Sequence, residues 1–363
     1  MIALLGRQDF PTDGVEDYCN YLGQALGRRG VQLTISRVDW TKTGWLRALW
    51  KLRRESARWG DAWVLLQYTA LGWSRRGLPF GAVLALIALR RQGKRCAVVF
   101  HEPVALKGIR WIDKLRAACQ NLVLRQLHRH SEKSIMTVPL ESVDWLPKGG
   151  GKTAFIPIGA NIPEPLAIRA QGPAKNGKKM TVAVYCVDPP PYRAKQLDDI
   201  AQAVLPAVKN GTPLRVLFLG KGTVEARDEI ERKFRGTGVE ASILGIVEPE
   251  EIRRSLSESE ALLSVRGTVY PRRGSAIAGV ACGLPIVGYT DGSDIFPLSE
   301  AGLWLAPRGD QAALAKALGE VLHDSGLRDE LGSRSRCAYE QIFSWDAIAA
   351  KYADLLHTEG MQI

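Results

Sequence analysis

Short apolar runs alternate with longer stretches of helical periodicity along most of the chain. In its first part, strands are predicted at residues 2–5, 31–36, 62–67, 95–100, 134–138 and 154–158. Helices are predicted between them, at residues 15–29, 77–92 and 111–130. Strands that alternate with helical segments favour a parallel sheet covered on both faces. The first half therefore predicts a Rossmann-like α/β domain.

The same alternation returns after a break in the pattern. Strands are predicted at residues 181–186, 214–219, 241–245, 261–265 and 284–287. Helices are predicted at residues 198–208, 224–234, 249–257, 275–282, 312–322 and 343–356. The stretch between the two halves is rich in Pro, Gly, Ala and Lys, which is typical of a linker. We predict a first domain at 1–161, a linker at 162–179, a second Rossmann-like domain at 180–342, and a C-terminal helix at 343–363 that crosses back to the first domain.

The region from Trp40 to Trp63 combines tryptophans with basic residues. A stripe of apolar side chains runs along one side of the expected helix, and basic side chains run along the other. The plain interpretation is a helix docked on the sheet with a solvated basic face. The alternative is a segment that binds an anionic membrane surface. Both hold if only part of the stripe docks.

Charge divides unevenly between the two halves. Residues 1–161 hold 25 Lys and Arg against 12 Asp and Glu, whereas the remaining residues hold 24 against 26. A one-sided basic surplus is typical of proteins that meet an anionic partner, such as a membrane surface, a phosphorylated acceptor or nucleic acid.

Leader and membrane-spanning segments are not predicted. The opening MIALLGRQDF turns polar too early for a signal peptide, and no apolar run reaches the roughly 18 residues needed to cross a bilayer. We expect a cytoplasmic protein, or one held peripherally on the inner face of the cell membrane. Its six cysteines are scattered singly, which favours reduced core thiols over a metal site or disulfide frame.

Candidate chemistry concentrates in residues 261–289, where the pattern reads strand, loop, helix, strand. Gly274 and Ser275 stand where the helix begins, and the preceding loop carries Arg266, Arg272 and Arg273. Backbone N–H groups at a helix start favour anions. The alternative is a tightly packed α/β connection with a solvated loop.

Two more loops of the second half offer cations. Lys221 lies beside Gly222 after a buried strand, and Arg193 and Lys195 precede a helix. Each loop alone is compatible with a solvated turn. Together with Arg272, Arg273 and Ser275 they predict a convergent set of cations and helix N-termini suited to a diphosphate.

The first half offers a crevice above its own sheet. Asp13 and Gly14 lie in a loop after the first strand, and His101 and Glu102 follow the strand at 95–100. Ligands of open parallel sheets bind at the carboxyl ends of the strands. We predict that these residues line an acceptor site, the alternative for His101 being a structural histidine. The KGGGKT stretch at 148–153 lacks the first glycine of a phosphate-binding loop and is expected to be a turn.

Six motifs in this order resemble the GT-B glycosyltransferases, and among them the retaining family 4. They are Gly14 with its following helix, His101, IPIGANIP at 156–163, FLGKGT at 218–223, ACGLPIVG at 281–288 and FSWDAIAAKY at 343–352. The resemblance implies parallel sheets facing a central cleft, an acceptor on the first domain, a nucleotide-sugar on the second, and transfer without metal or other cofactor. It also implies that Lys195 contacts donor phosphate and that His101 faces the donor sugar.

The chain departs from the family pattern at three positions. Tyr270 and Ala278 occupy the places of the two glutamates of the usual Glu-x7-Glu motif, and Pro190 occupies the place of an arginine. We hypothesise that Arg272, Arg273 or Ser275 takes over part of the donor contact.

The function that the resemblance implies is hexosyl transfer, with retention, from a nucleotide-diphosphate sugar to a glycan or lipid-linked acceptor in bacterial surface polysaccharide or glycolipid synthesis. The alternative is a weakened GT-B protein that serves as a sugar-nucleotide- or glycan-binding accessory subunit, which the missing glutamates favour. Specific nucleic-acid binding is not expected, because no recognised module accompanies the basic surplus.

Overall fold

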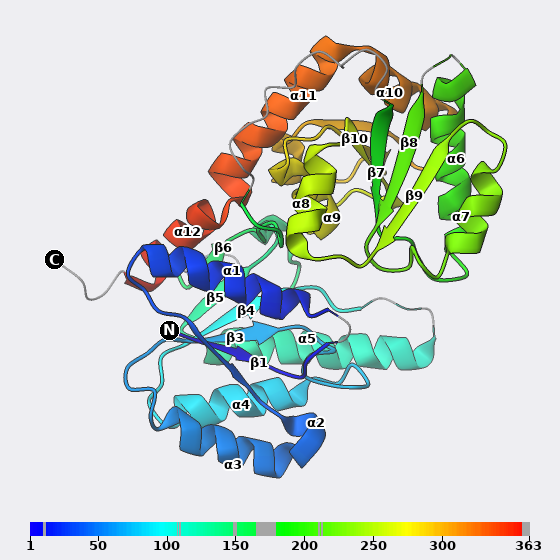
Figure 1. The fold of residues 1–363 in the computed structure, drawn as a ribbon. Helices are drawn as coiled ribbons and strands as arrows, with labels where there is room; N and C mark the ends of the chain where they lie inside the picture. The colour runs from blue at the N-terminus through cyan, green and yellow to red at the C-terminus, as the bar shows by residue number, and fades with distance from the viewer. Residues whose placement is uncertain are drawn as a thin grey trace. The chain divides into compact units, whose positions relative to one another are not determined.

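The chain folds into two compact units, which are shown in Figure 1. The computed structural model describes residues 1–9, 12–106, 108, 110–147, 151–164, 179–209, 211 and 213–357. Unit 1 comprises Met1–Ile158 together with Trp345–Ile363, and unit 2 comprises Gly159–Ser344. The predicted linker at 162–179 lies largely outside the described residues. Of the KGGGKT stretch, residues 148–150 lie outside them, Gly151 and Lys152 form a turn, and Thr153 begins a strand.

Unit 1 is built on a parallel sheet of six strands in the order β2-β1-β3-β4-β5-β6. The strands are β1 (Ile2–Leu5), β2 (Thr34–Arg37), β3 (Val64–Tyr68), β4 (Cys96–Phe100), β5 (Lys133–Met136) and β6 (Thr153–Phe155). The central strands β3 and β4 are buried along their whole length, as expected where helices cover both faces.

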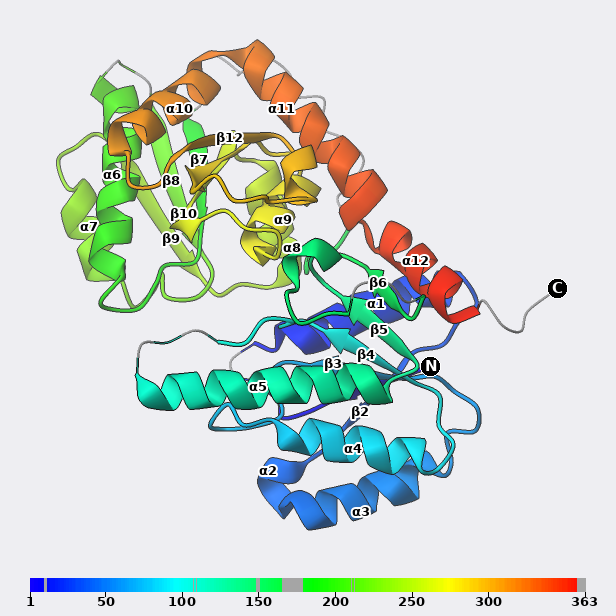
Figure 2. The same ribbon diagram turned by 180° about the vertical axis from the view of Figure 1, so that it is seen from behind.

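Helices form one layer on each face of this sheet (Figures 1 and 2). They are α1 (Gly14–Arg28), α2 (Trp40–Thr43), α3 (Trp45–Ser56), α4 (Phe80–Arg90), α5 (Trp111–His130) and α12 (Trp345–His357). Alternate residues of the strands enter two separate cores: one packs against α1 and α12, the other against α3, α4 and α5. The last helix of the chain thus belongs to the first unit.

The tryptophans of the 40–63 region have unequal surroundings. Trp40 and Trp63 are buried, and Trp45 stacks on Trp40 at 5.1 Å between ring centroids. Trp50, in contrast, is 61% exposed. The ends of the region thus pack into the core, whereas its middle, on α3, exposes Leu46 and Trp50. Binding of this region to an anionic membrane surface stays a prediction.

Unit 2 has a second parallel sheet of six strands, in the order β12-β11-β10-β7-β8-β9. The strands are β7 (Met180–Tyr185), β8 (Leu214–Leu219), β9 (Glu240–Gly245), β10 (Ala261–Thr268), β11 (Ile286–Thr290) and β12 (Leu303–Pro307). The helices are α6 (Arg193–Lys209), α7 (Arg227–Phe234), α8 (Pro249–Ser257), α9 (Gly274–Ala281), α10 (Gln311–His323) and α11 (Ser325–Ala338). The predicted α/β class with two Rossmann-like parallel sheets is confirmed.

The position of α9 follows from its small residues. Ala261, Leu263 and Val265 of β10 point into the core shared with α6, α7 and α10. Leu262 points to the opposite face, where a Cβ on Gly279 of α9 would lie only 2.7 Å from its side chain. Glycine at this position lets α9 lie close to the sheet and places the first turn of the helix beside the end of β10.

Candidate functional site

The loops that follow β7 and β10 diverge at the centre of the unit 2 sheet. From β7 the chain proceeds to β8 and β9 on one side, and then returns to β10 on the other side of β7. Such a reversal of strand order leaves a crevice at the carboxyl ends of the two neighbouring strands, and ligands of open α/β sheets bind there.

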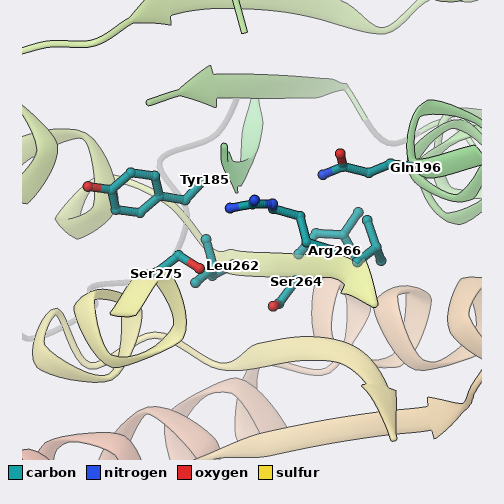
Figure 3. A pocket seen from close by; sticks show the side chains of 8 residues that line it. Tyr185, Gln196, Leu262, Ser264, Arg266 and Ser275 are labelled. Carbon is teal, nitrogen blue, oxygen red and sulfur yellow. The ribbon is translucent and has the colours of Figure 1, made fainter. Parts of the chain in front are cut away.

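A narrow pocket, whose side chains as they stand leave no interior room for a water molecule, occupies this crevice. Its lining residues are Tyr185, Gln196, Leu262, Leu263, Ser264, Val265, Arg266 and Ser275. Arg266 rises from β10 between Tyr185 and Gln196, and Ser275 lies at the start of α9 (Figure 3). The pocket therefore combines a guanidinium with the N-terminus of a helix, which suits an anionic group.

Asp188 holds the guanidinium of Arg266 in place. Its Oδ1 accepts from Arg266 Nε at 2.8 Å, and the side chains of Arg266 and Asp188 stay 35% and 21% exposed. Because β10 continues to Thr268, Arg266 is a strand residue and not part of the loop that the sequence suggested. A strand fixes this side chain more firmly than a loop does.

Gln196, on α6, stabilises the loop after β7 by two hydrogen bonds to its backbone. Its Oε1 accepts from the backbone N–H of Asp188 at 2.7 Å, and its Nε2 donates to the carbonyl of Cys186 at 3.1 Å. Gln196 is only 3% exposed. Cys186 has a φ of 71°, a conformation that costs energy for a residue with a Cβ. The amide of Gln196 thus stabilises a strained backbone next to the pocket.

Arg273 is engaged with its own loop. Its guanidinium donates to the carbonyls of Arg266, at 2.5 Å, and Thr268, at 3.0 Å, and lies over the ring of Tyr270 at 4.4 Å. Burial lowers the pKa of Arg273. This residue does not line the pocket; it ties the loop between β10 and α9 to the end of the strand. Arg272 is half-buried in the same loop, and Gly274 is exposed at the first position of α9.

Arg193 and Lys195 lie in the first turn of α6, because that helix begins five residues earlier than predicted. Arg193 donates to the carbonyl of Asp188 and pairs with Glu229 at 3.0 Å, and its side chain is 12% exposed. Lys195 Nζ lies 2.8 Å from the buried carboxylate of Asp199, yet its side chain is 68% exposed. The Arg193 guanidinium is held by Asp188 and Glu229, whereas the Lys195 side chain is mostly exposed to solvent. Neither residue lines the pocket.

Lys221 and Gly222 belong to the loop after β8, which packs against the loop after β7. The carbonyl of Lys221 accepts from the N–H of Val187 at 2.9 Å. A Cβ on Gly222 would lie 2.0 Å from the carbonyl oxygen of Val187. Burial raises the pKa of the Cys186 thiol, and the charges of Arg266 and Lys221 both act in the opposite direction. The positive charges of Arg266, on β10, and of Lys221, on the loop after β8, thus both act on this thiol.

The predicted residues of unit 1 lie at the carboxyl ends of its own strands. His101 follows β4, its Nε2 lies 2.8 Å from Gln67 Oε1, and its ring meets Tyr18 edge-on at 4.9 Å. Since Gln67 Nε2 donates to the carbonyl of Leu65, the Gln67 oxygen faces the histidine and accepts from a proton on Nε2. Gln67 thus sets the tautomer of His101.

The acidic residues of this group have structural partners. Asp13 caps α1 by accepting from the N–H groups of Val15 and Glu16, and it pairs with Arg37 at 3.0 Å. Gly14 is the first residue of that helix. Glu102 accepts from the N–H of Ala70 at 2.7 Å. These contacts stabilise the loops around His101.

Four important residues were missed by sequence reasoning. Asp188, Gln196, Tyr185 and Gln67 carry no recognisable motif, and their roles follow from contacts across the sheet. Within the described part of the chain, no three His, Cys, Asp or Glu side chains gather to form a metal site.

A family model matches part of unit 2, the unit that contains this pocket. Residues 183–324 match the family model described as glycosyl transferases group 1. No curated protein matches significantly by sequence.

Solved structures match over the whole chain. Sucrose-phosphate synthase from Thermosynechococcus elongatus superposes with a TM-score of 0.68 at 18% identity, over 98% of each chain. HepE from Anabaena in complex with UDP-glucose has a TM-score of 0.65 at 14% identity, over 99% of this chain and 100% of that one. WaaG, a glycosyltransferase involved in lipopolysaccharide biosynthesis, has a TM-score of 0.57 at 11% identity, over 99% and 100%. At these identities the likeness shows the fold, and the fold is GT-B.

Proposed function

We propose that this GT-B protein, whose residues 183–324 match the glycosyl transferases group 1, moves a sugar from a nucleotide-diphosphate sugar to a glycan or lipid-linked acceptor. The observation that carries the proposal is the pocket between β7 and β10, in which Arg266 and the start of α9 meet inside the segment matched by the family model. HepE, with the same fold, binds UDP-glucose, which supports a nucleotide-sugar donor.

The proposed role of the cations follows from the charge changes of the reaction. When the bond between sugar and diphosphate breaks, negative charge builds on the leaving phosphates. Arg266 and the first N–H groups of α9 are already oriented by Asp188 and by the helix, so little reorganisation is needed. Loss of one such preorganised donor costs roughly 100-fold or more in related sites.

Lys195 and Lys221 are assigned supporting roles on the donor phosphates. Lys195 is paired with Asp199, but an ammonium has three donors and the side chain is mostly exposed, so a phosphate oxygen can be added as a further partner. Lys221 is exposed on a glycine-flanked loop whose backbone allows close approach. Neither role depends on a metal ion, and we propose that transfer proceeds without one.

The acceptor is proposed to be a glycan or lipid-linked glycan of a bacterial cell surface, with His101 positioning it or the donor sugar. The likeness in fold to WaaG supports this acceptor class. His101 has a fixed ring orientation through Gln67 and Tyr18, as a positioning residue requires. We assign the acceptor proton to the leaving phosphate, and the retaining outcome and hexosyl specificity are part of the same proposal.

A donor screen tests the proposal directly. The melting temperature of the full chain is measured with UDP-, GDP-, ADP- and TDP-sugars, and the donor that stabilises is then used in a transfer assay with and without EDTA. We expect one nucleotide class to raise the melting temperature, since a ligand that binds only the folded state stabilises it. Transfer should be unchanged by EDTA.

Arg266→Gln provides the matched variant, and Lys316→Gln on α10 is the control because its exposed ammonium lies away from the pocket. We expect the first change to abolish donor stabilisation and the second to preserve it. Donor binding without any transfer or hydrolysis would favour the accessory-subunit alternative. Absence of stabilisation by every donor would contradict both.

A further inference from the structure

We propose that unit 1 binds the surface of an anionic lipid membrane through its layer of helices α3, α4 and α5, here termed the basic apolar face. This inference does not depend on the proposed function, because it rests on exposed side chains and charges of unit 1 alone. In the described part of the chain no helix is long and apolar enough to span a bilayer, so the contact is with the surface.

Most exposed large apolar side chains of unit 1 lie on this face, and the others lie on the loops that lead into it. Among its described residues, eleven large hydrophobic side chains are exposed, and all lie on α3, α4, α5 or the loops that lead into α4 and α5. The clearest are Leu46 (88%), Trp50 (61%), Trp111 (76%), Leu115 (51%) and Leu122 (51%). Exposed apolar patches of this kind mark interaction sites.

The long helix α5 shows the arrangement best. Trp111, Leu115 and Leu122 follow one another at helical spacing, and the exposed basic residues Lys114 and Arg125 lie beside them. The opposite side of the helix, with Val123 and Leu127 among others, is fully buried against the sheet. Thus α5 is apolar on both sides, although only one side has a partner within unit 1.

Charge distinguishes the two faces of the unit. The helices α3, α4 and α5 carry nine Lys and Arg against two carboxylates, and both carboxylates are near basic neighbours: Glu55 pairs with Lys51 and Asp113 with Arg116. The helices α1 and α12 on the other face carry two Lys and Arg against four Asp and Glu. The basic surplus of the helices therefore lies on the layer formed by α3, α4 and α5, which Figure 2 shows on the side of the sheet opposite α1 and α12.

Trp50 and Arg54 combine both properties in one contact. The guanidinium of Arg54 lies over the Trp50 ring at 4.6 Å from its centroid. An indole and a guanidinium together suit the boundary between headgroups and acyl chains, where the ring meets hydrocarbon and the cation meets phosphate.

Other occupants fit less well. A nucleic acid would use the cations but has no place for exposed leucines such as Leu46, Leu84 and Leu122. A second copy of the chain would bring the same positive charge against itself. A surface that joins anionic headgroups to hydrocarbon matches both kinds of side chain.

Vesicle cosedimentation tests the charged part of the proposal. The full chain is mixed with phosphatidylcholine vesicles, with and without phosphatidylglycerol. We expect binding only to the anionic vesicles, and its loss at high salt. Arg47→Glu with Arg125→Glu should weaken it about tenfold or more. Lys316→Glu with Arg232→Glu makes the same charge change on exposed positions of unit 2 and should leave most of the binding.

The apolar part is tested with brominated acyl chains, which quench a tryptophan only when it enters the hydrocarbon. Trp50→Phe with Trp111→Phe should remove most of the quenching, and Trp304→Phe in unit 2 should not. Leu84→Ser should also weaken binding, whereas Ile246→Ser, at an equally exposed site of unit 2, should not. Unchanged melting temperatures of the same variants would show that they still fold. Unchanged stabilisation by the donor would show that the loss of vesicle binding is independent of the proposed function.

Three outcomes would overturn the proposal. The first is equal binding to neutral and anionic vesicles, and the second is absence of binding at low salt. The third concerns duplex DNA as a competitor. The proposal fails if Arg47→Glu with Arg125→Glu weakens DNA binding but leaves vesicle binding unchanged.

Discussion

Arg266 and Arg273 lie seven residues apart and carry the same charge, but their surroundings differ. Arg266 faces the pocket with one carboxylate partner, whereas Arg273 donates to two backbone carbonyls. The sequence placed both in the loop before α9, and of the two it offered only Arg273 as a donor ligand. Their roles differ because Arg266 lies on β10, whereas Arg273 lies in the loop directly before α9. A donor contact by Arg273 remains a prediction. Its hydrogen bonds in the structure stabilise the loop between β10 and α9.

These surroundings predict that substitution of Arg266 mainly affects donor binding and that substitution of Arg273 mainly affects stability. Arg266→Gln should weaken donor binding with a stability cost of at most about 1 kcal/mol, because its ion pair is partly exposed. Arg273→Gln should lower the free energy of unfolding by about 1–3 kcal/mol, since two carbonyls lose a charged donor. Urea denaturation and donor titration on both variants give the comparison. If Arg273→Gln proved neutral for stability, the role of a loop tie would be refuted.

His128 predicts a specific dependence of stability on pH. It is 9% exposed, its Nδ1 lies 2.9 Å from Ser134 Oγ, and burial, with a smaller contribution from Lys152, lowers its pKa to about 4 from 6.5. The unfolded chain therefore binds a proton between pH 6.5 and 4 that the folded chain does not, and stability falls as pH falls through that range.

The measurement is the free energy of unfolding at pH 7 and pH 5 for the protein and for His128→Gln. The protein should lose more stability over this interval than the variant, because the variant lacks the titrating group. Carboxylates contribute equally to both and cancel in the difference. An identical loss in both proteins would show that His128 does not titrate in this way.

At the scale of elements, the loops around the pocket depend on close backbone contact. Gly222 has a φ of 81° and lies against the carbonyl of Val187, where a Cβ would come within 2.0 Å. Gly236 has a φ of 73° but no atom within 4 Å of its Cβ position. The two glycines share a backbone conformation and differ in their neighbours.

Alanine at these two positions should distinguish the cost of a left-handed backbone conformation from the cost of a steric clash of the new Cβ. Gly236→Ala should cost about 1–2 kcal/mol for the left-handed backbone alone. Gly222→Ala should cost about 1–3 kcal/mol more and also weaken donor binding, because the loops after β7 and β8 must move apart. Thermal unfolding and donor titration measure both effects. Equal costs at the two sites would mean that the β8 loop adapts freely.

Most elements could be predicted from the sequence because buried strands and amphipathic helices have a strong periodicity. The bounds of β1, α5, β8 and α8 agree with the predicted ones. The misses have physical reasons. The end of β10, Arg266-Gly267-Thr268, is not apolar, so the strand was predicted to stop at Val265. The α11 segment contains Gly326 and Gly332 and little apolar periodicity, and it was not predicted.

The candidate site was predictable in part. The start of α9 could be recognised from Gly274 and Ser275, because a glycine and a serine before a small-residue run begin a helix. The contribution of Asp188 could not, since it depends on which strand lies next to β10. Adjacency of β7 and β10 is a property of the sheet order and leaves no local trace in either segment.

At the scale of the whole molecule, α12 completes the core of unit 1 from the far end of the chain. Trp345, Ile348 and Tyr352 are fully or almost fully buried, and the Tyr352 hydroxyl lies 2.9 Å from that of Tyr18 on α1. Trp345 also meets the Tyr18 ring edge-on at 5.0 Å. Since Tyr18 in turn contacts His101, α12 supports the predicted acceptor site of unit 1.

Trp345→Ala should therefore destabilise unit 1 selectively, by about 3–5 kcal/mol. Hydrogen exchange read by mass spectrometry should show lost protection in β1, β3 and α1, with β7, β8 and β10 unaffected. Tyr352→Phe is the milder control, which removes one hydrogen bond worth about 1 kcal/mol. Uniform loss of protection in both units would contradict the assignment of α12 to unit 1.

The return of α12 also sets the order in which a newly made chain can mature. A ribosome completes residues 159–344 before it reaches Trp345, so unit 2 can fold while the apolar side of α1 still lacks its cover. At about 5–20 residues per second, this interval lasts roughly ten seconds or more. During translation, the first domain to emerge is the last to be finished, and its uncovered surface is a natural target for chaperones.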